Sequence, residues 1–220
     1  MEVSRRIAEI RATLREGVKL VAVSKFHTVE ALLEAYNAGQ RIFGESRVPE
    51  LAAKQSALPD DIEWHFIGPL QANKVKYIAP FISMIQSVDT LRLMSEIDRQ
   101  AAKCGRKINV LIEVHIAEEE SKHGFSTGEC RKLFEEGAFK RFENIRICGL
   151  MGMATFTDNT AQIRREFAGL RDLFDEIRSM LAIDKNCFSE LSMGMSDDYE
   201  TAIEAGSTMV RLGTVIFGKR

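Results

Sequence analysis

The run Val18-Lys-Leu-Val-Ala-Val-Ser-Lys-Phe26 decides the fold of this chain, because it places a lysine where an apolar strand ends. Its Val, Leu and Ala residues are typical of a strand buried on both faces. Lys25 follows the strand directly, before a helical pattern that opens near Thr28. Functional groups of parallel sheets and barrels lie at the carboxyl ends of the strands. Partial burial there favours a neutral amine that attacks carbonyls, whereas the alternative is a lysine that only reaches out to water.

Strand-like runs recur along the whole chain, and each is separated from the next by a helical pattern. The eight runs lie at residues 18–23, 41–44, 62–67, 83–88, 108–114, 145–153, 187–193 and 208–212. Strict alternation predicts a parallel sheet with right-handed crossovers. Eight units favour an α/β fold of the (β/α)8 TIM barrel type. An open doubly wound sheet is the alternative, but the first strand lacks the G-x-G-x-x-G fingerprint of that fold.

An extra helix precedes the first strand. Val3, Ile7, Ile10 and Leu14 recur at helical spacing and form one apolar stripe on a charged segment. No change of composition marks a domain boundary. We therefore expect residues 1–220 to form a single barrel domain with an N-terminal helix.

Composition excludes several classes of partner. The 30 Lys and Arg residues are balanced by 32 Asp and Glu residues, which argues against binding to nucleic acid. Four widely spaced cysteines argue against a disulfide framework and a zinc site. No apolar run has the length of a membrane span, and residues 1–17 resemble neither a signal peptide nor a transit peptide. We expect a cytoplasmic protein without a membrane or nucleic-acid partner.

The strand ends of a barrel converge on one face, so the residues there are the candidates for a site. They include neither a recognisable Ser-His-Asp set nor a set of metal ligands. Many are small, which lets a ligand approach the backbone. His65 and Met151 can equally be core residues. The candidates are Lys25, Ser46, His65, Met151, Ser192, Gly194, Arg211, Gly213 and Thr214.

The loops after the last two strands favour an anion. Barrels often bind phosphate there with backbone N–H groups. Ser196 is interpreted as the N-cap of the helix that follows the seventh strand, and Asp197 and Asp198 after it would repel an anion. We therefore expect the anion near residues 192–194 and 213–214, although tight turns alone would also explain the glycines.

Five motifs follow one another along nearly the whole chain: Ala22-Val-Ser-Lys25, His65-Phe-Ile-Gly-Pro-Leu-Gln-Ala-Asn-Lys74, Gly149-Leu-Met-Gly-Met153, Leu191-Ser-Met-Gly-Met-Ser-Asp-Asp198 and Val210-Arg-Leu-Gly-Thr-Val-Ile-Phe-Gly218. Together they resemble the pyridoxal phosphate homeostasis protein family, which is similar to the N-terminal barrel of alanine racemase.

That resemblance implies a site for pyridoxal 5′-phosphate (PLP). The cofactor would be held as a Schiff base on Lys25, with its phosphate at Ser192, Gly213 and Thr214. Arg211 would lie near the pyridine nitrogen. Ser46 stands where many relatives carry Asn, and we expect it among the cofactor-binding residues as well.

Three functions are compatible with this reading. The first is a PLP carrier that acts in PLP homeostasis and in amino and keto acid balance, as the resemblance implies. The second is a PLP-dependent racemase or decarboxylase, and the third is an aldolase-type lyase that uses Lys25 without a cofactor.

The first function is favoured for two reasons. The chain ends shortly after the eighth strand, so we expect no second domain to supply a second base. Arg211 beside the ring nitrogen would weaken the ring as an electron sink. We expect a monomer that is not an enzyme, at most exchanges α-protons slowly, and supplies PLP to PLP-dependent apo-enzymes.

Overall fold

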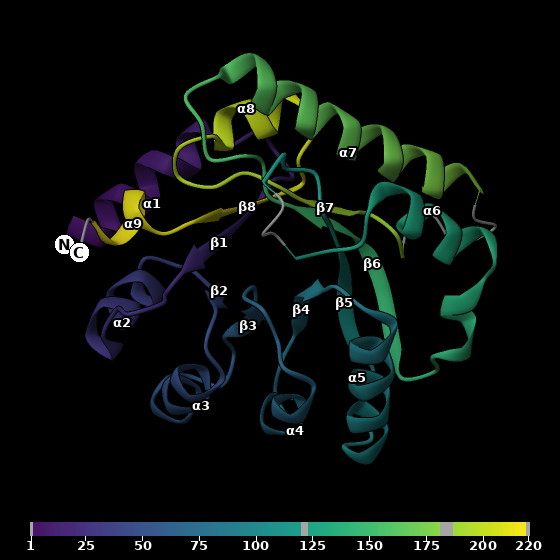
Figure 1. The fold of residues 1–220 in the computed structure, drawn as a ribbon. Coiled ribbons are helices and arrows are strands. Elements are labelled where there is room, and N and C mark those ends of the chain that lie inside the picture. Colours follow the sequence, from purple (N-terminus) through teal and green to yellow (C-terminus); the bar gives the residue numbers. More distant parts are fainter. Residues whose placement is uncertain (1, 120–122, 181–186, 219–220) are drawn as a thin grey trace.

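Eight parallel strands close into a barrel in the computed structural model, which describes residues 2–119, 123–180 and 187–218 (Figure 1). The strands follow one another around the barrel in chain order, and β1 pairs with β8 to close it. The predicted (β/α)8 barrel is therefore confirmed. The strands are β1 (Lys19–Val23), β2 (Ile42–Glu45), β3 (Glu63–Phe66), β4 (Met84–Val88), β5 (Ile108–Val114), β6 (Ile145–Gly152), β7 (Glu190–Ser192) and β8 (Met209–Leu212).

The helices between the strands cover the outside of the barrel (Figure 1). Thr28 caps the second helix as its side chain accepts a hydrogen bond from the Ala31 N–H, and Thr90 caps the fifth in the same way. The helices are α1 (Glu2–Thr13), α2 (Val29–Asn37), α3 (Val48–Ala57), α4 (Val75–Ile78), α5 (Leu91–Lys103), α6 (Thr127–Glu135), α7 (Thr160–Met180), α8 (Tyr199–Glu204) and α9 (Thr214–Phe217), with short 3-10 helices at Ala72–Lys74 and Ala138–Arg141.

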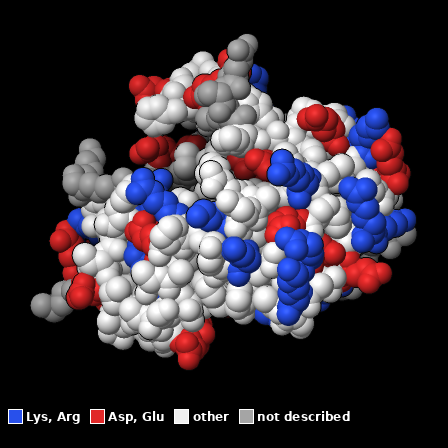
Figure 2. Space-filling view, turned by 60° about the horizontal axis from the view of Figure 1, so that its bottom comes forward, with Lys and Arg blue, Asp and Glu red and all other residues white. Residues whose placement is uncertain are grey.

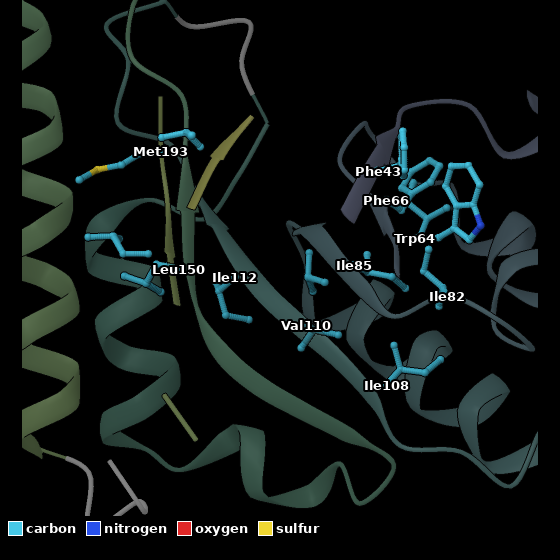
Figure 3. Close-up of a cluster of buried hydrophobic side chains, with 14 of the residues drawn as sticks. Phe43, Trp64, Phe66, Ile82, Ile85, Ile108, Val110, Ile112, Leu150 and Met193 are labelled. Carbon is cyan, nitrogen blue, oxygen red and sulfur yellow. The ribbon is translucent and has the colours of Figure 1, made fainter. Parts of the chain in front are cut away.

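Alternation along the strands divides the buried side chains into two groups. One group lies between the strands and the helices, where aromatic and branched residues such as Phe43, Phe66 and Ile85 pack together (Figure 3). The other group fills the barrel and consists of Val21, Met84, Leu111, Cys148, Met151 and Met209. Residues 21 and 209 thereby mark the inward-facing register of β1 and β8.

The predicted N-terminal helix is confirmed as α1, and it lies beside α9 where both ends of the chain meet (Figure 1). Val3, Ile7 and Ile10 are buried as the apolar stripe predicted. The Arg6 guanidinium donates to the Ile216 carbonyl of α9 over 3.4 Å. This contact ties the start of the chain to the segment that follows β8.

Most strand ends differ from the sequence-based expectation by one residue, and two boundaries differ by more. The strand expected at residues 187–193 spans only Glu190–Ser192, because Phe188 packs between Phe134 and Phe174 outside the barrel. The strand expected at residues 41–44 ends one residue later, at Glu45, and α3 then begins at Val48 with Pro49 in its first turn, where its missing N–H costs nothing. The interpretation of Ser196 as an N-cap is wrong, because Asp198 precedes α8.

The surface carries both signs of charge. Lys and Arg side chains alternate with Asp and Glu side chains over the face that Figure 2 shows, without a continuous basic field. Within the described part of the chain, none of the helices is both long enough and apolar enough to cross a membrane.

Candidate functional site

Lys25 stands just beyond the carboxyl end of β1. Val21, four residues before Lys25, faces the barrel interior, and the chain turns directly after the strand, at residues 25 and 26. Lys25 is half-buried, and its ammonium group makes no hydrogen bond or ion pair with the residues that the structure describes. The next residue, Phe26, has a φ of 66°, which is uncommon outside glycine. A sharp turn therefore follows a lysine whose side chain has no partner among the described residues.

Arg211 lies inside the barrel, two residues beyond Met209 and opposite Val21 of β1. Its side chain is only 4% exposed. One terminal nitrogen donates to the carbonyl and to the hydroxyl of Ser192, over 3.0 and 2.6 Å, and the other donates to the Gly152 carbonyl over 3.0 Å.

Two of the five guanidinium N–H groups of Arg211 remain for a ligand, since three are used in these bonds. Burial lowers the pKa of Arg211 to about 10, and the carboxylates of Asp198 and Glu113 oppose that change. The group is therefore a cation at neutral pH.

A chain of hydrogen bonds crosses the barrel interior from Arg211 to His65. The Ser192 hydroxyl donates to Gln86 Oε1 over 2.7 Å, and Gln86 Nε2 lies 2.9 Å from His65 Nδ1. Burial lowers the pKa of His65 to about 3, with a smaller contribution from Lys19, so the ring is neutral at pH 7. Because the Gln86 amide donates to Nδ1, the ring proton lies on Nε2.

In this hydrogen-bond network, Ser192 and His65 bind other side chains, whereas their positions in the sequence suggested contacts with a cofactor. Both side chains are buried, and the Ser192 hydroxyl already has a donor and an acceptor. The prediction that Ser192 binds phosphate stays untested. In the structure, Ser192 orients Arg211, because its carbonyl and hydroxyl oxygens both accept hydrogen bonds from that guanidinium.

Ser196 and Gly213 bring the loop after β7 against the start of α9. The Gly213 N–H donates to Ser196 Oγ over 3.4 Å, and a Cβ atom on Gly213 would lie 3.3 Å from Val23. Thr214 is exposed at the start of α9, where the first backbone N–H groups have no partner within the helix. A hydroxyl and several backbone donors therefore lie together, which suits an anion.

Sequence reasoning missed Ser196 because Ser-Asp-Asp before a helix is typical of an N-cap. Asp198 instead accepts a hydrogen bond from the Met195 N–H over 2.6 Å, and its side chain makes no capping bond to α8. Burial raises the pKa of Asp198, and nearby Arg211 opposes this.

The remaining three candidates lie on or directly after strands β2, β6 and β7. Gly194 has a φ of +96°, and a Cβ atom there would lie 2.6 Å from that of Ala202 in α8. Met151 is fully buried in the barrel interior. Ser46 is half-buried at the end of β2, and a Cβ atom on Gly68 would lie 2.8 Å from its Cβ atom. Contacts from these three residues to a cofactor remain predictions.

Besides Ser196, sequence reasoning also did not select Glu113, whose side chain faces the barrel interior. It lies two residues after Leu111 on β5, is 4% exposed, and has no hydrogen bond from its carboxylate to the described residues. Burial and the charge of Asp89 raise its pKa to about 7, whereas Arg211 opposes the increase. The only signal in the sequence was one acid in a largely apolar strand.

Two cavities lie at opposite ends of the barrel. One of about 560 Å³ is lined by residues 154–158 after β6 and by Met195, Asp197 and Asp198 after β7, at the end where Lys25 lies. The other, of about 250 Å³, is lined by residues from the amino ends of the strands, including Lys19, Glu190 and His65. His65 therefore borders the end of the barrel away from Lys25.

The chain matches one protein family over residues 2–220, and that family is described as the alanine racemase N-terminal domain. Among named relatives, the pyridoxal phosphate homeostasis protein of Aquifex aeolicus is 41% identical over 92% of this chain and 87% of its own length. The protein of the same name from Pasteurella multocida is 35% identical over 100% of this chain and 98% of its own length.

Solved structures give the same picture. The structure of PipY from Synechococcus elongatus with PLP bound superimposes on this chain with a TM-score of 0.88. The two sequences are 34% identical, and the match covers 98% of this chain and all of that chain. Without PLP, PipY superimposes with a TM-score of 0.91 at 36% identity. Alanine racemase of Streptomyces lavendulae shares the fold, with a TM-score of 0.81 at 15% identity, over all of this chain and 57% of that chain.

Proposed function

Because the chain belongs to the alanine racemase N-terminal domain family, with relatives named pyridoxal phosphate homeostasis proteins, we propose that it binds PLP and acts in intracellular PLP homeostasis and in amino and keto acid balance. The observation that carries the proposal is the Lys25 amine, which has no partner among the described residues and lies at the end of the barrel where ligands bind.

The residues around Lys25 fit the three functional groups of PLP. The amine of Lys25 suits the aldehyde, with which it forms a Schiff base. Ser196 and Thr214 offer hydroxyls, and the first turn of α9 after Gly213 offers backbone N–H groups for the phosphate. Arg211 retains two N–H groups that can meet the ring nitrogen.

The character of Arg211 favours a carrier over an enzyme. Bound PLP supplies an aldehyde that condenses with amines and a ring that withdraws electrons. A guanidinium that stays charged at neutral pH gives no proton to the ring nitrogen and disfavours its protonation. The ring is then a poor electron sink, which weakens racemase or decarboxylase chemistry.

The first test locates the covalent bond. Borohydride reduction of the PLP-loaded protein, followed by peptide mass spectrometry, should place the pyridoxyl group on Lys25. Lys25→Ala is the matched variant and should lose the adduct. An adduct confined to Lys74, on the outside of the barrel, would contradict the proposal.

The second test separates the carrier from a racemase, the alternative enzyme. The PLP-loaded protein is incubated with L-alanine in deuterated water, and both deuterium uptake and D-alanine are measured. Slow uptake without D-alanine is expected, since one face of the substrate meets one base. Rapid formation of D-alanine in proportion to protein would establish the racemase.

We also propose that the protein is a cytoplasmic monomer that passes PLP to PLP-dependent apo-enzymes. Activation of an apo-transaminase by the loaded protein should be faster than its activation by the PLP that the protein releases into solution. Sedimentation of the loaded chain as a dimer would contradict the monomer.

A further inference from the structure

We propose that Glu50 and Lys54 of α3, supported by Glu45, position the Lys25 amine by holding the peptide groups on both sides of it. This inference rests on the proposed role of Lys25 in binding PLP. It assigns a function to charged residues that lie outside the barrel mouth and that no ligand needs to touch.

Lys54 holds the peptide group before Lys25. Its side chain is buried although it is charged, being only 5% exposed. The ammonium group donates to the Ser24 carbonyl over 2.7 Å, to Glu45 over 2.6 Å and to Glu50 over 2.7 Å. All three N–H groups of the ammonium are therefore used, and one is bound to the backbone immediately before Lys25.

Glu50 holds the peptide group after Lys25. The same carboxylate oxygen that pairs with Lys54 accepts a hydrogen bond from the Phe26 N–H over 2.5 Å. Phe26 has the left-handed φ of 66°, and the Arg47 guanidinium lies 4.4 Å from the centre of its ring. A non-glycine residue adopts this φ at a cost, so the turn requires contacts that hold it.

Glu45, the last residue of β2, is the second acid that pairs with Lys54. Its fully buried carboxylate accepts hydrogen bonds from the Ser24 hydroxyl over 2.8 Å and from the Ser46 N–H over 3.2 Å, besides the ion pair with Lys54. Burial is the largest single influence and raises the pKa of Glu50, but the hydrogen bonds from Lys54 and the Phe26 N–H, together with the charges of Lys54 and Arg47, lower that pKa overall. Both carboxylates are thus matched to a single cation.

The placement of these bonds indicates positioning rather than stability. Buried ion pairs contribute little net stability compared with well-packed apolar residues of similar size. This one directs its bonds at the backbone of residues 24 and 26, and leaves the Lys25 side chain without a partner among the described residues. Holding a reactive group near its productive geometry lowers the cost of bond formation.

The test uses Glu50→Ala, since Glu50 is partly exposed and its loss leaves the Glu45–Lys54 pair intact. Asp175→Ala is the matched control, because it removes the acid of another i,i+4 ion pair, on α7. Glu50→Gln keeps an acceptor oxygen for the Phe26 N–H. Far-UV circular dichroism and urea unfolding first establish that each variant is folded.

Three readouts separate positioning from folding. The rate of PLP attachment to Lys25 should fall about tenfold in Glu50→Ala, as for one lost hydrogen bond to a charged group, and recover in part in Glu50→Gln. Affinity for pyridoxine 5′-phosphate, which lacks the aldehyde, should stay unchanged. Hydrogen exchange of the Phe26 amide in the cofactor-free protein should become faster only in the Glu50 variants.

Each result decides a separate question. If the unsubstituted protein attaches no PLP to Lys25, the proposed function fails. If it attaches PLP and Glu50→Ala does so at the same rate, the positioning role is wrong. An equal loss of affinity for pyridoxine 5′-phosphate would also overturn it, because the substitution would then have disturbed the whole mouth of the barrel.

Discussion

Glu113 should make the stability of this protein depend on pH. Its carboxyl group is buried inside the barrel, and burial together with the charge of Asp89 raises its pKa from a usual 4.5 to about 7. The folded protein therefore keeps a proton that the unfolded chain releases between these two pH values. As pH rises through this window, the unfolded state is favoured.

The magnitude follows from the two pKa values. Each pKa unit corresponds to about 1.4 kcal/mol, so the full penalty approaches roughly 3 kcal/mol above pH 7 and vanishes below pH 4.5. Glu113→Gln removes the charge but keeps the shape. The variant should therefore gain about 2–3 kcal/mol of unfolding free energy relative to the unsubstituted protein between pH 4.5 and pH 8.

Urea unfolding at pH 4.5, 6, 7 and 8 measures this difference. Glu143→Gln serves as the control, because Glu143 is exposed and its substitution changes the net charge equally. The control should follow the unsubstituted protein at every pH. Parallel curves for Glu113→Gln and the unsubstituted protein would refute the reasoning, since they would mean that the buried carboxyl group has an ordinary pKa.

Three further predictions address the site and its support. Ser196→Ala should weaken PLP affinity about tenfold in an equilibrium titration, and Ser192→Ala should weaken it less; the reverse order would place the phosphate at Ser192. Gly194→Ala should lower the unfolding free energy by about 1–3 kcal/mol, because its Cβ atom would collide with α8, whereas Gly128→Ala on open surface should not; equal effects would contradict the collision. Gln86→Met should cost about 2–4 kcal/mol by leaving the Ser192 hydroxyl without an acceptor and His65 Nδ1 without a donor, and a neutral result would show that water replaces the amide.

The strands and their order were predictable because each is a short apolar run bounded by turn residues, and a parallel barrel follows from their alternation with helices. The position of Lys25 followed from the same reasoning, since the end of β1 is set by local sequence. The length of β7 was not predictable, because Phe188 leaves the strand only when α6 and α7 provide aromatic neighbours.

The hydrogen-bonding partners inside the site depend on tertiary structure, so local sequence patterns could not predict them. Ser192 and Ser196 lie four residues apart, at the end of β7 and in the loop after it, but only the fold pairs the first with Arg211 and brings the second to Gly213. Glu50 and Lys54 have the i,i+4 spacing of an ordinary surface pair. Nothing in that spacing indicates that the pair reaches the backbone on either side of Lys25.

The pairing of β1 with β8 determines when this site comes into existence. Lys25 follows the first strand, whereas Arg211 and Gly213 belong to the last strand and the segment after it. As the chain leaves the ribosome, β1 has an unsatisfied edge until β8 is made, and such distant pairings form slowly. An unfinished chain therefore contains Lys25 but not Arg211 and Gly213, which complete the proposed site. Under the proposed function, capture of the PLP aldehyde by the complete site therefore requires that β8 has already paired with β1.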